Sequence, residues 1–309
     1  MTEVIRADYL TKKFGKNTVV DHVSFEVSEG EIFGFLGQNG AGKTTTTRML
    51  TGVLPSNSGT ATILGYDIMK SPVHAKQRFG VVPETSNAYI DLSAQQNMFL
   101  MGELYDLPKS KILQRTEELL TLVGLIERKD QKVQAYSKGM KQRLILAMSL
   151  IHEPELLFLD EPTSGLDVQS THMILSLLRD LNRNGMTIFL TTHNMEEANQ
   201  LCNRVGIIRA GKMIAIDAPE KLKSAIDREH RIEVSFAKDV PSIEPGDLPG
   251  IIRAEKTGDK WQIIVSDKDA AIRSIVAYSG EQNTVIVTLN TLAPTLDEAF
   301  IRLTREEER

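Results

Sequence analysis

The chain has 309 residues, of which 41% are hydrophobic and 25% are charged, and its formal net charge is -5. This composition is that of a soluble globular protein, and the length suffices for one large and one smaller domain, each with its own core. The net acidity gives no signature of polyanion binding, so we expect no nucleic-acid partner. No stretch approaches the length of apolar sequence that spans a bilayer, and the opening MTEVIRADYL lacks a signal-peptide pattern, so we expect neither membrane insertion nor export of the chain itself.

Cys202 is the only cysteine. A single cysteine excludes an internal disulfide and a cysteine-based metal site, and it fits a reducing cytosol. We expect its thiol to be buried as a small hydrophobic group rather than exposed as a reactive one.

The first part of the chain predicts strands. Apolar and polar residues alternate over 4–10 and 19–27, which indicates two antiparallel strands. The apolar run 32–36 predicts a buried strand that leads into a glycine-rich loop, and further strands are expected over 60–64 and 79–83.

Residues 37–44 read GQNGAGKT, a complete G-x-x-x-x-G-K-T motif between the strand 32–36 and a predicted helix from Thr44 to Leu50. Its glycines are expected to adopt positive φ and to shape a nest of backbone N–H groups, to which the helix N-terminus adds its positive end. Lys43 should reach the β and γ phosphates of a nucleotide, and the Thr44 hydroxyl should bind magnesium. A turn that only links strand to helix would not need the whole motif. The predicted nucleotide-binding residues of the loop are Gly37, Gln38, Asn39, Gly40, Ala41, Gly42, Lys43, Thr44 and Thr45.

The middle of the chain changes from strand to helix and back. From about 85 to 150 apolar residues recur at helical spacing without a strand between them, which predicts an inserted helical lobe. A strand over 156–159, a helix that stops at Gly185 and a strand over 187–190 follow. This β-α-β order requires a parallel sheet.

Two carboxylates, Asp160 and Glu161, directly follow the strand 156–159, at the strand end where such sheets bind ligands. Asp160 is expected to face Thr44 and to hold magnesium directly or through water, and Glu161 to orient or deprotonate an attacking water. In isolation the two acids could simply cap the next turn. His193 follows the strand 187–190 and should emerge at the same sheet edge, within reach of a γ-phosphate, whereas the other five histidines have no identifiable partner and are expected to be surface or structural.

Beyond about residue 222 the pattern resets. Alternation over 232–236, around Trp261 and over 285–289, with a helical stretch over 269–279, predicts a small α+β domain. It ends in a helix that begins with a capping box, Thr295 to Glu298, and we expect 242–250 to be a loop within it. The domain boundary is expected between Leu222 and His230, which gives domains 1–222 and 223–309.

The motifs GQNGAGKT, YSKGMKQR (136–143), LLFLDEP (156–162), SGLD (164–167) and the TTH that ends at His193 give the chain a resemblance to ATP-binding cassette (ABC) ATPases over roughly residues 3–222. The resemblance implies an α/β P-loop NTPase (RecA-like) core with an antiparallel β subdomain and an inserted helical lobe. It also implies ATP and Mg²⁺ as cofactors, Glu161 and His193 as catalytic residues, and Thr44 and Asp160 as magnesium ligands. The nucleotide would lie between the phosphate loop of one chain and the signature segment 136–140 of a second copy, in a head-to-tail homodimer. The nucleotide-binding residues that the resemblance adds are Phe14, which would stack on adenine, Glu84, Ser137, Gly139 and Asp167.

The chain departs from the family pattern at two places. Glu84 follows Pro83 where the family usually has glutamine, and it is a further candidate magnesium ligand or a charge that opposes closure; the sequence leaves both open. Lys138 and Met140 stand where glycine and glutamine are commonest in the signature, while Ser137 and Gly139 are retained. Lys138 would add positive charge near an anion.

The ending APTLDEAFIRLT (293–304) resembles the accessory domain of cassette ATPases from bacterial and archaeal exporters, with a regulatory or a dimer-stabilising role equally open. The resulting expectation is a cytoplasmic ATPase subunit, peripheral on the inner face of the cell membrane, that powers export through transmembrane permease subunits on separate chains. The alternatives are a soluble cassette protein that acts as a mechanical switch on ribosomes or DNA, and a nucleotide sensor without hydrolysis. The sequence does not indicate the transported substrate.

Overall fold

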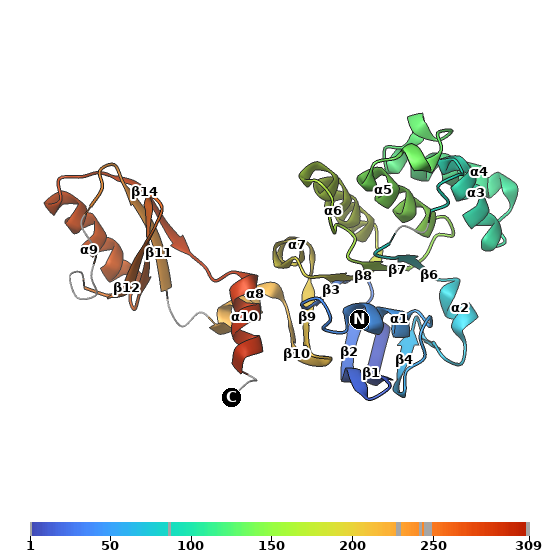
Figure 1. The fold of residues 1–309 in the computed structure, drawn as a ribbon, viewed down its shortest axis with the longest axis horizontal. Coiled ribbons are helices and arrows are strands. Elements are labelled where there is room, and N and C mark those ends of the chain that lie inside the picture. Colours follow the sequence, from blue (N-terminus) through green and yellow to red (C-terminus); the bar gives the residue numbers. More distant parts are fainter. Residues whose placement is uncertain (1, 86–87, 227–229, 241–242, 244–248, 307–309) are drawn as a thin grey trace. The chain divides into compact units, whose positions relative to one another are not determined.

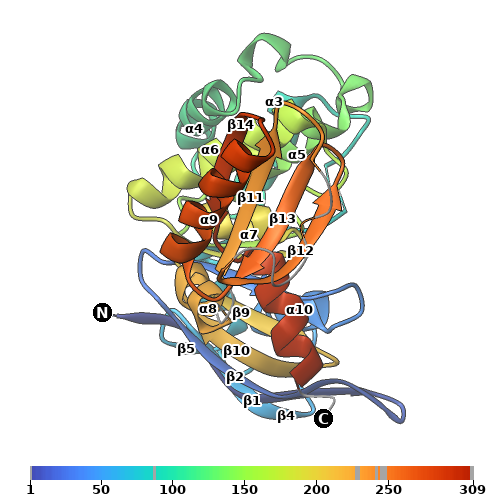
Figure 2. The same cartoon turned by 90° about the vertical axis from the view of Figure 1, so that its left-hand side faces the viewer.

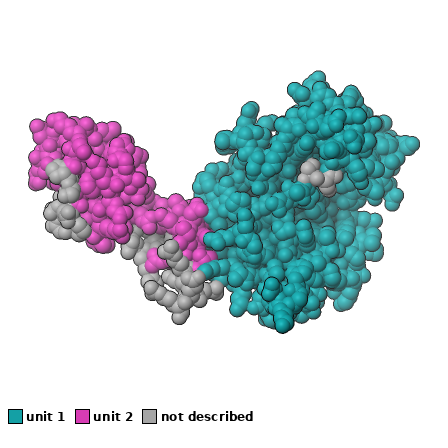
Figure 3. All heavy atoms as spheres, viewed as in Figure 1, with its two compact units in different colours: residues 1–219 teal, residues 220–309 magenta. Residues whose placement is uncertain are grey.

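The computed structural model of the chain describes residues 2–85, 88–226, 230–240, 243 and 249–306. It divides into two compact units, residues 1–219 and 220–309 (Figure 3). The predicted boundary region overlaps the end of helix α8 (Pro219–Ile226) and includes residues 227–229, which are outside the described ranges.

An antiparallel sheet forms the first part of unit 1. Buried and exposed residues alternate along β2, as the apolar-polar alternation of its sequence predicts. The predicted strands over 4–10 and 19–27 are confirmed and pair with each other as β1 and β2. In sheet order, the strands are β2 (Asn17–Ser28), β1 (Glu3–Phe14), β4 (Ser58–Ile63) and β5 (Tyr66–Asp67).

The second sheet of unit 1 carries the glycine-rich loop. Every residue of its strands β3, β7 and β8 is buried, as expected for central parallel strands that are covered on both faces. The parallel pairing predicted from the β-α-β order is confirmed, and only the edge strand β10 runs antiparallel to its neighbour. In sheet order, the strands are β10 (Lys212–Asp217), β9 (Arg204–Arg209), β3 (Ile32–Leu36), β8 (Thr187–Thr192), β7 (Leu156–Asp160) and β6 (Phe79–Val82).

Helix α1 (Lys43–Leu50) lies on the face of this sheet that the antiparallel sheet also covers, and α6 (Val168–Arg183) lies on the opposite face (Figure 1). The predicted helical lobe is confirmed over its described residues, and Figure 2 shows its helices from a second side. It consists of α3 (Ala94–Leu104), α4 (Lys109–Leu122), two short 3-10 turns (Ile126–Arg128 and Val133–Ala135) and α5 (Lys138–Ser149). The short helices α2 (Pro72–Lys76) and α7 (Met195–Leu201) complete unit 1.

Aromatic side chains fill the space between the two sheets. Phe25 of β2 stacks on Phe33 of β3 and Phe189 of β8, with ring centroids 5.5 and 5.8 Å apart. Each ring contributes about 2 to 3 kcal/mol by burial. This core fixes the strand that precedes the glycine-rich loop. Cys202 is buried as predicted, and burial raises the pKa of its thiol.

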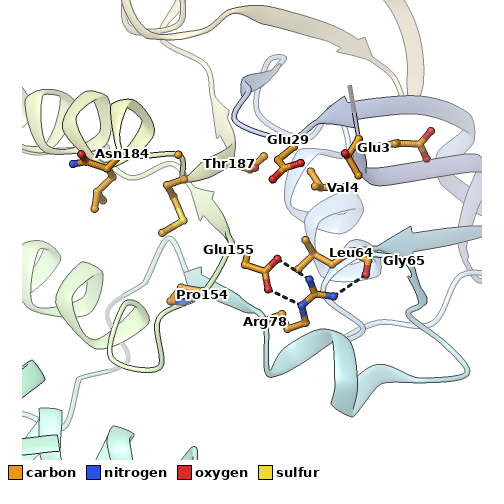
Figure 4. Close-up of a pocket in the computed structure, with 14 residues that line it drawn as sticks. Glu3, Val4, Glu29, Leu64, Gly65, Arg78, Pro154, Glu155, Asn184 and Thr187 are labelled. Atoms are coloured by element: carbon orange, nitrogen blue, oxygen red, sulfur yellow. Dashed lines mark hydrogen bonds and ion pairs between the residues drawn. The ribbon is translucent and has the colours of Figure 1, made fainter. Parts of the chain in front are cut away.

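A charged clasp links the sheets at the amino ends of the parallel strands. The Arg78 guanidinium donates to both carboxylate oxygens of Glu155, at 2.7 and 2.6 Å, and to the Leu64 carbonyl at 3.2 Å (Figure 4). The clasp lies in the wall of a cavity of about 520 Å³ that Val4, Glu29 and other residues of both sheets also line. This end of the sheet is opposite the edge where the glycine-rich loop lies.

His152 fastens the helical lobe to the core. Its ring stacks on Tyr105 at the end of α3, with centroids 3.7 Å apart, and its Nε2–H donates to the Phe79 carbonyl. Burial lowers the pKa of His152 to about 4, so the ring is neutral near pH 7. The sequence indicated no partner for this histidine, and the structure gives it two.

Unit 2 is an α+β unit, as predicted. Ile232, Val234, Trp261 and Ile275 contribute to its core, in which α9 (Lys268–Glu281) packs against the sheet. The capping box is confirmed: the Glu298 N–H donates to Thr295 Oγ1 and the Thr295 N–H to Glu298 Oε2, both at 3.2 Å. In sheet order, the strands are β12 (Ile251–Thr257), which the sequence did not predict, β13 (Lys260–Val265), β11 (His230–Phe236) and β14 (Ile286–Leu292), and the last helix is α10 (Leu296–Glu306). The predicted loop 242–250 lies largely outside the described residues.

None of the helices in the described part of the chain combines the length and the apolarity that crossing a bilayer requires.

Candidate functional site

The loop between β3 and α1 lines a cavity, and two of its glycines have positive φ. Gly40 and Gly42 have φ values of 82° and 108°, as predicted. The prediction of positive φ is wrong for Gly37. Glycine is needed there because a Cβ atom would lie 2.6 Å from the Ile208 carbonyl oxygen of β9. Close packing of the loop against the neighbouring strand, rather than backbone conformation, therefore explains this glycine.

The Lys43 side chain is buried and donates hydrogen bonds to the backbone of its own loop. It is 6% exposed, and its Nζ donates to the carbonyl oxygens of Gly37 at 2.7 Å and Gln38 at 3.3 Å. The same Nζ lies 3.2 Å from Glu161 Oε1. The lysine thus joins the phosphate loop to the end of β7.

Oxygen atoms of three neighbouring elements meet beside the loop. Thr44 Oγ1 donates to Asp160 Oδ1 at 3.3 Å, as the sequence predicts, and Thr191 Oγ1 of β8 donates to the same oxygen at 2.5 Å. Hydroxyl and carboxylate oxygens are the hard ligands that Mg²⁺ prefers, and magnesium sites commonly complete their coordination with waters and phosphate oxygens. Thr44 and Asp160 therefore fit this ion. Sequence reasoning missed Thr191, although its place two residues before His193 was a usable signal.

The Glu161 carboxylate lies between Lys43 and His193. His193 Nδ1 lies 2.7 Å from Glu161 Oε2, which confirms the predicted meeting of these two residues at one sheet edge. The other oxygen, Oε1, accepts no hydrogen bond from the described residues, although the Lys43 ammonium lies beside it. Glu161 itself has a φ of 50°, an uncommon value outside glycine, and the Thr191 carbonyl and hydroxyl both accept from its N–H. This conformation aims a carboxylate, 8% exposed, at the space over the loop.

A cavity of about 280 Å³ lies at the loop. The exposed Glu84 lines it together with residues of the phosphate loop, as the resemblance implied. Val19 of β2 also lines it, and sequence reasoning missed this residue. Gln38 and Ala41 belong to the loop but do not line this cavity. The residues that line it are Val19, Asn39, Gly40, Gly42, Lys43, Thr44, Thr45, Glu84 and Glu161. A second cavity of about 340 Å³ begins on the other side of Glu161 and includes Ser164 and His193.

Four of the five residues that the resemblance adds to the site are not among the described residues that line the cavity at the phosphate loop. Ser137 accepts a hydrogen bond from the Met140 N–H and so caps α5, as predicted. Gly139 is buried in the first turn of that helix. Asp167 caps α6 by accepting from Ser170, and these bonds hold the pKa of its carboxyl below its usual range. Phe14 is 50% exposed at the end of β1.

Known proteins are similar to this chain in sequence. The ABC transporter family matches residues 20–164. The linearmycin resistance ATP-binding protein LnrL of Bacillus subtilis is 37% identical over 309 residues, which cover 97% of this chain and 98% of that protein. The Nod factor export ATP-binding protein I of Ralstonia nicotianae is 36% identical over 308 residues, with 100% and 96% coverage.

The fold also matches solved structures. An ATP-binding subunit of an ABC transporter superimposes with a TM-score of 0.66 at 28% identity, over 72% of this chain and 92% of the other. Similarity to LnrL over nearly the whole of both chains, together with the phosphate loop and the paired carboxylates, establishes the family. The chain belongs to the ABC transporter family and is an ATP-binding subunit with the ATPase fold and activity of that family.

Proposed function

We propose that this chain is the Mg²⁺-dependent ATPase of an exporter and works as a head-to-tail homodimer beneath transmembrane subunits on separate chains. Residues 1–222 would form the nucleotide-binding domain and 223–309 an accessory domain. The names of its relatives, an export and a resistance ATP-binding protein, support the direction of transport. No nucleic-acid partner is proposed. A switch on ribosomes or DNA has less support, because these relatives are transport or resistance proteins.

The phosphate loop supplies the binding energy for the nucleotide. Backbone N–H groups of residues 38–45 and the N-terminus of α1 would bind the phosphates, and Lys43 would turn from Glu161 toward them. Thr44 and Asp160 would hold Mg²⁺, which neutralises phosphate charge when bound. Glu84, which lines the same cavity, would contact the ion or its waters.

The Glu161 carboxylate carries the proposal. It lies between Lys43 Nζ at 3.2 Å and His193 Nδ1 at 2.7 Å, at the mouth of the loop cavity. Once Lys43 binds phosphate, Glu161 is free to accept a proton from an attacking water, and His193 fixes its orientation. Loss of such a base lowers turnover by about 100-fold or more.

A second copy would complete the site. Ser137, Gly139 and Asp167 lie outside the loop cavity of their own chain, so we assign them to the nucleotide of the partner, where the capped N-terminus of α5 would face the γ-phosphate. Phe14, half exposed beside the core, would stack on the adenine of its own chain. Closure on ATP and opening after hydrolysis would drive the membrane subunits.

The test is the full-length Glu161→Gln variant with Mg-ATP. We expect phosphate release at least about 100-fold below wild type and a dimer in sedimentation velocity that wild type forms only transiently. The control is Glu103→Gln, which removes one exposed carboxylate on α3 and should leave turnover unchanged. Turnover of Glu161→Gln at the wild-type rate would contradict the assigned base.

The transporter assignment needs a separate measurement. Affinity purification of the chain from native membranes should recover a protein with several membrane spans. Recovery of ribosomes or DNA in its place would support the switch.

A further inference from the structure

Lys138 is the departure from the family pattern whose position the structure explains. It is the first residue of α5, directly after the N-cap Ser137. A cation is unfavourable there because the N-terminal end of a helix dipole is positive, and no acidic residue occupies the first turn. The Lys138 side chain turns away from the helix axis, and its Nζ donates to the Ser164 carbonyl at 2.7 Å.

The residue after Ser164 is a glycine that leaves room for the Lys138 ammonium. Gly165 has a φ of 65°, and a Cβ atom on it would lie 2.4 Å from Lys138 Nζ. A side chain at 165 would therefore displace the ammonium. The Ser164 N–H donates to the Glu161 carbonyl at 3.1 Å, so a single residue, Ser164, connects Lys138 to the backbone of the proposed base.

A second contact fastens the far end of the same segment. Asp167 accepts from the N–H and the hydroxyl of Ser170, both at 2.8 Å. Ser170 packs closely on Gly139, since a Cβ atom added to Gly139 would lie 2.3 Å from Ser170 Oγ. The first turn of α5 therefore grips residues 164–170 at both ends.

We propose that Lys138 is a positioning residue for ATP hydrolysis, which sets the conformation of residues 164–167 and the turn that begins at Glu161 through its hydrogen bond to Ser164. The inference rests on the proposed role of Glu161 as base. In the proposed dimer, the signature segment of a chain contacts the nucleotide of its partner, whereas Glu161 acts on the nucleotide of its own chain. The hydrogen bond from Lys138 to Ser164 would therefore connect the two nucleotide sites. The competing role is direct binding of phosphate by the Lys138 ammonium, for which the ammonium would have to leave Ser164.

The test compares full-length Lys138→Met, Lys138→Arg and Lys141→Met. Lys141→Met removes the same charge from the same helix at a partly exposed position. We expect Lys138→Met to lower kcat for ATP about tenfold with little change in KM, Lys138→Arg to recover most of kcat, and Lys141→Met to match wild type.

Amide hydrogen exchange without nucleotide gives a readout that does not depend on hydrolysis. In Lys138→Met the N–H groups of residues 164–167 should exchange faster than in wild type and in Lys141→Met, while the α1 amides stay unchanged. A raised KM at constant kcat with unchanged exchange would assign the ammonium to phosphate, and equal behaviour of Lys138→Met and Lys141→Met would also overturn the proposal. If wild type lacks ATPase activity, the proposed function fails while the exchange measurement still tests the hydrogen bond.

Discussion

The lysine of the phosphate loop lies beside a buried carboxylate, with 3.2 Å between Lys43 Nζ and Glu161 Oε1. Lys43 and Glu161 are 6% and 8% exposed, so their charges are shielded from water and compensate each other. In the proposed function, an incoming triphosphate would replace the carboxylate as counter-ion of the lysine. The proposed base would thereby be released only when a substrate is present.

Removal of the lysine alone should therefore destabilise the protein as well as abolish nucleotide binding. Lys43→Ala leaves the buried Glu161 carboxylate without its ammonium partner, and we expect the free energy of unfolding to fall by about 3 kcal/mol. Glu161→Gln removes that charge, so the double variant should recover much of the loss. Urea unfolding followed by far-UV circular dichroism measures both, and strictly additive effects would mean that the two groups do not interact. Isothermal titration with Mg-ATP checks the loss of binding.

Motif chemistry predicted that Lys43, Asp160 and His193 would lie at one edge of the sheet, and the structure places them there. Motif chemistry did not predict Thr191, which bonds both Asp160 and Glu161, because that contact depends on β8 lying next to β7. The reason for Gly37 was also missed, since Ile208 approaches it from a strand 171 residues away along the chain. Contacts between distant strands leave no pattern in the local sequence, and only the place of Thr191 two residues before His193 pointed to one of them.

At the scale of elements, long runs with one periodicity were predictable. The strands 32–36, 156–159 and 187–190 and the helix before Gly185 were found because a buried parallel strand is continuously apolar and an amphipathic helix repeats every three to four residues. The short elements α2 and β5 and the edge strands β10 and β12 were not predicted. Edge and short elements bury fewer residues, so their sequences carry weaker patterns.

The attachment of the helical lobe through His152 predicts a pH dependence. The pKa of this ring is about 4 in the folded chain against an ordinary value of 6.5, so the unfolded chain binds the extra proton first as pH falls. The free energy of unfolding should decrease from about pH 6.5 downward, by about 2 to 3 kcal/mol at pH 4.5 from this group.

His152→Phe keeps a ring against Tyr105 and removes the titration. Its stability, measured by urea unfolding, should therefore fall less steeply with pH than that of wild type over the same window. His74→Phe, at an exposed ring that stacks on Tyr66, controls for a new phenylalanine beside a tyrosine. Parallel pH profiles for wild type and His152→Phe would contradict the assignment.

At the scale of the molecule, the change of pattern near residue 222 was visible because a mixed sheet with helices gives way to alternating strands around one helix. The order of the strands in either unit was not predictable beyond the parallel β-α-β core, because strand order depends on packing between residues far apart in the chain. The helical lobe could be located by its spacing, but its attachment through Tyr105 and His152 could not.

The fluorescence of Trp261 allows the unfolding of one unit to be followed separately. It is the single tryptophan of the chain, and it is 7% exposed in the core of residues 220–309, so its intrinsic fluorescence reports on that unit. Mg-ATP stabilises the unit that binds it, so the thermal midpoint from circular dichroism should rise while the midpoint from tryptophan emission stays constant. If both midpoints rise together, the two units unfold cooperatively, and the emission of Trp261 then reports nucleotide binding to the other unit.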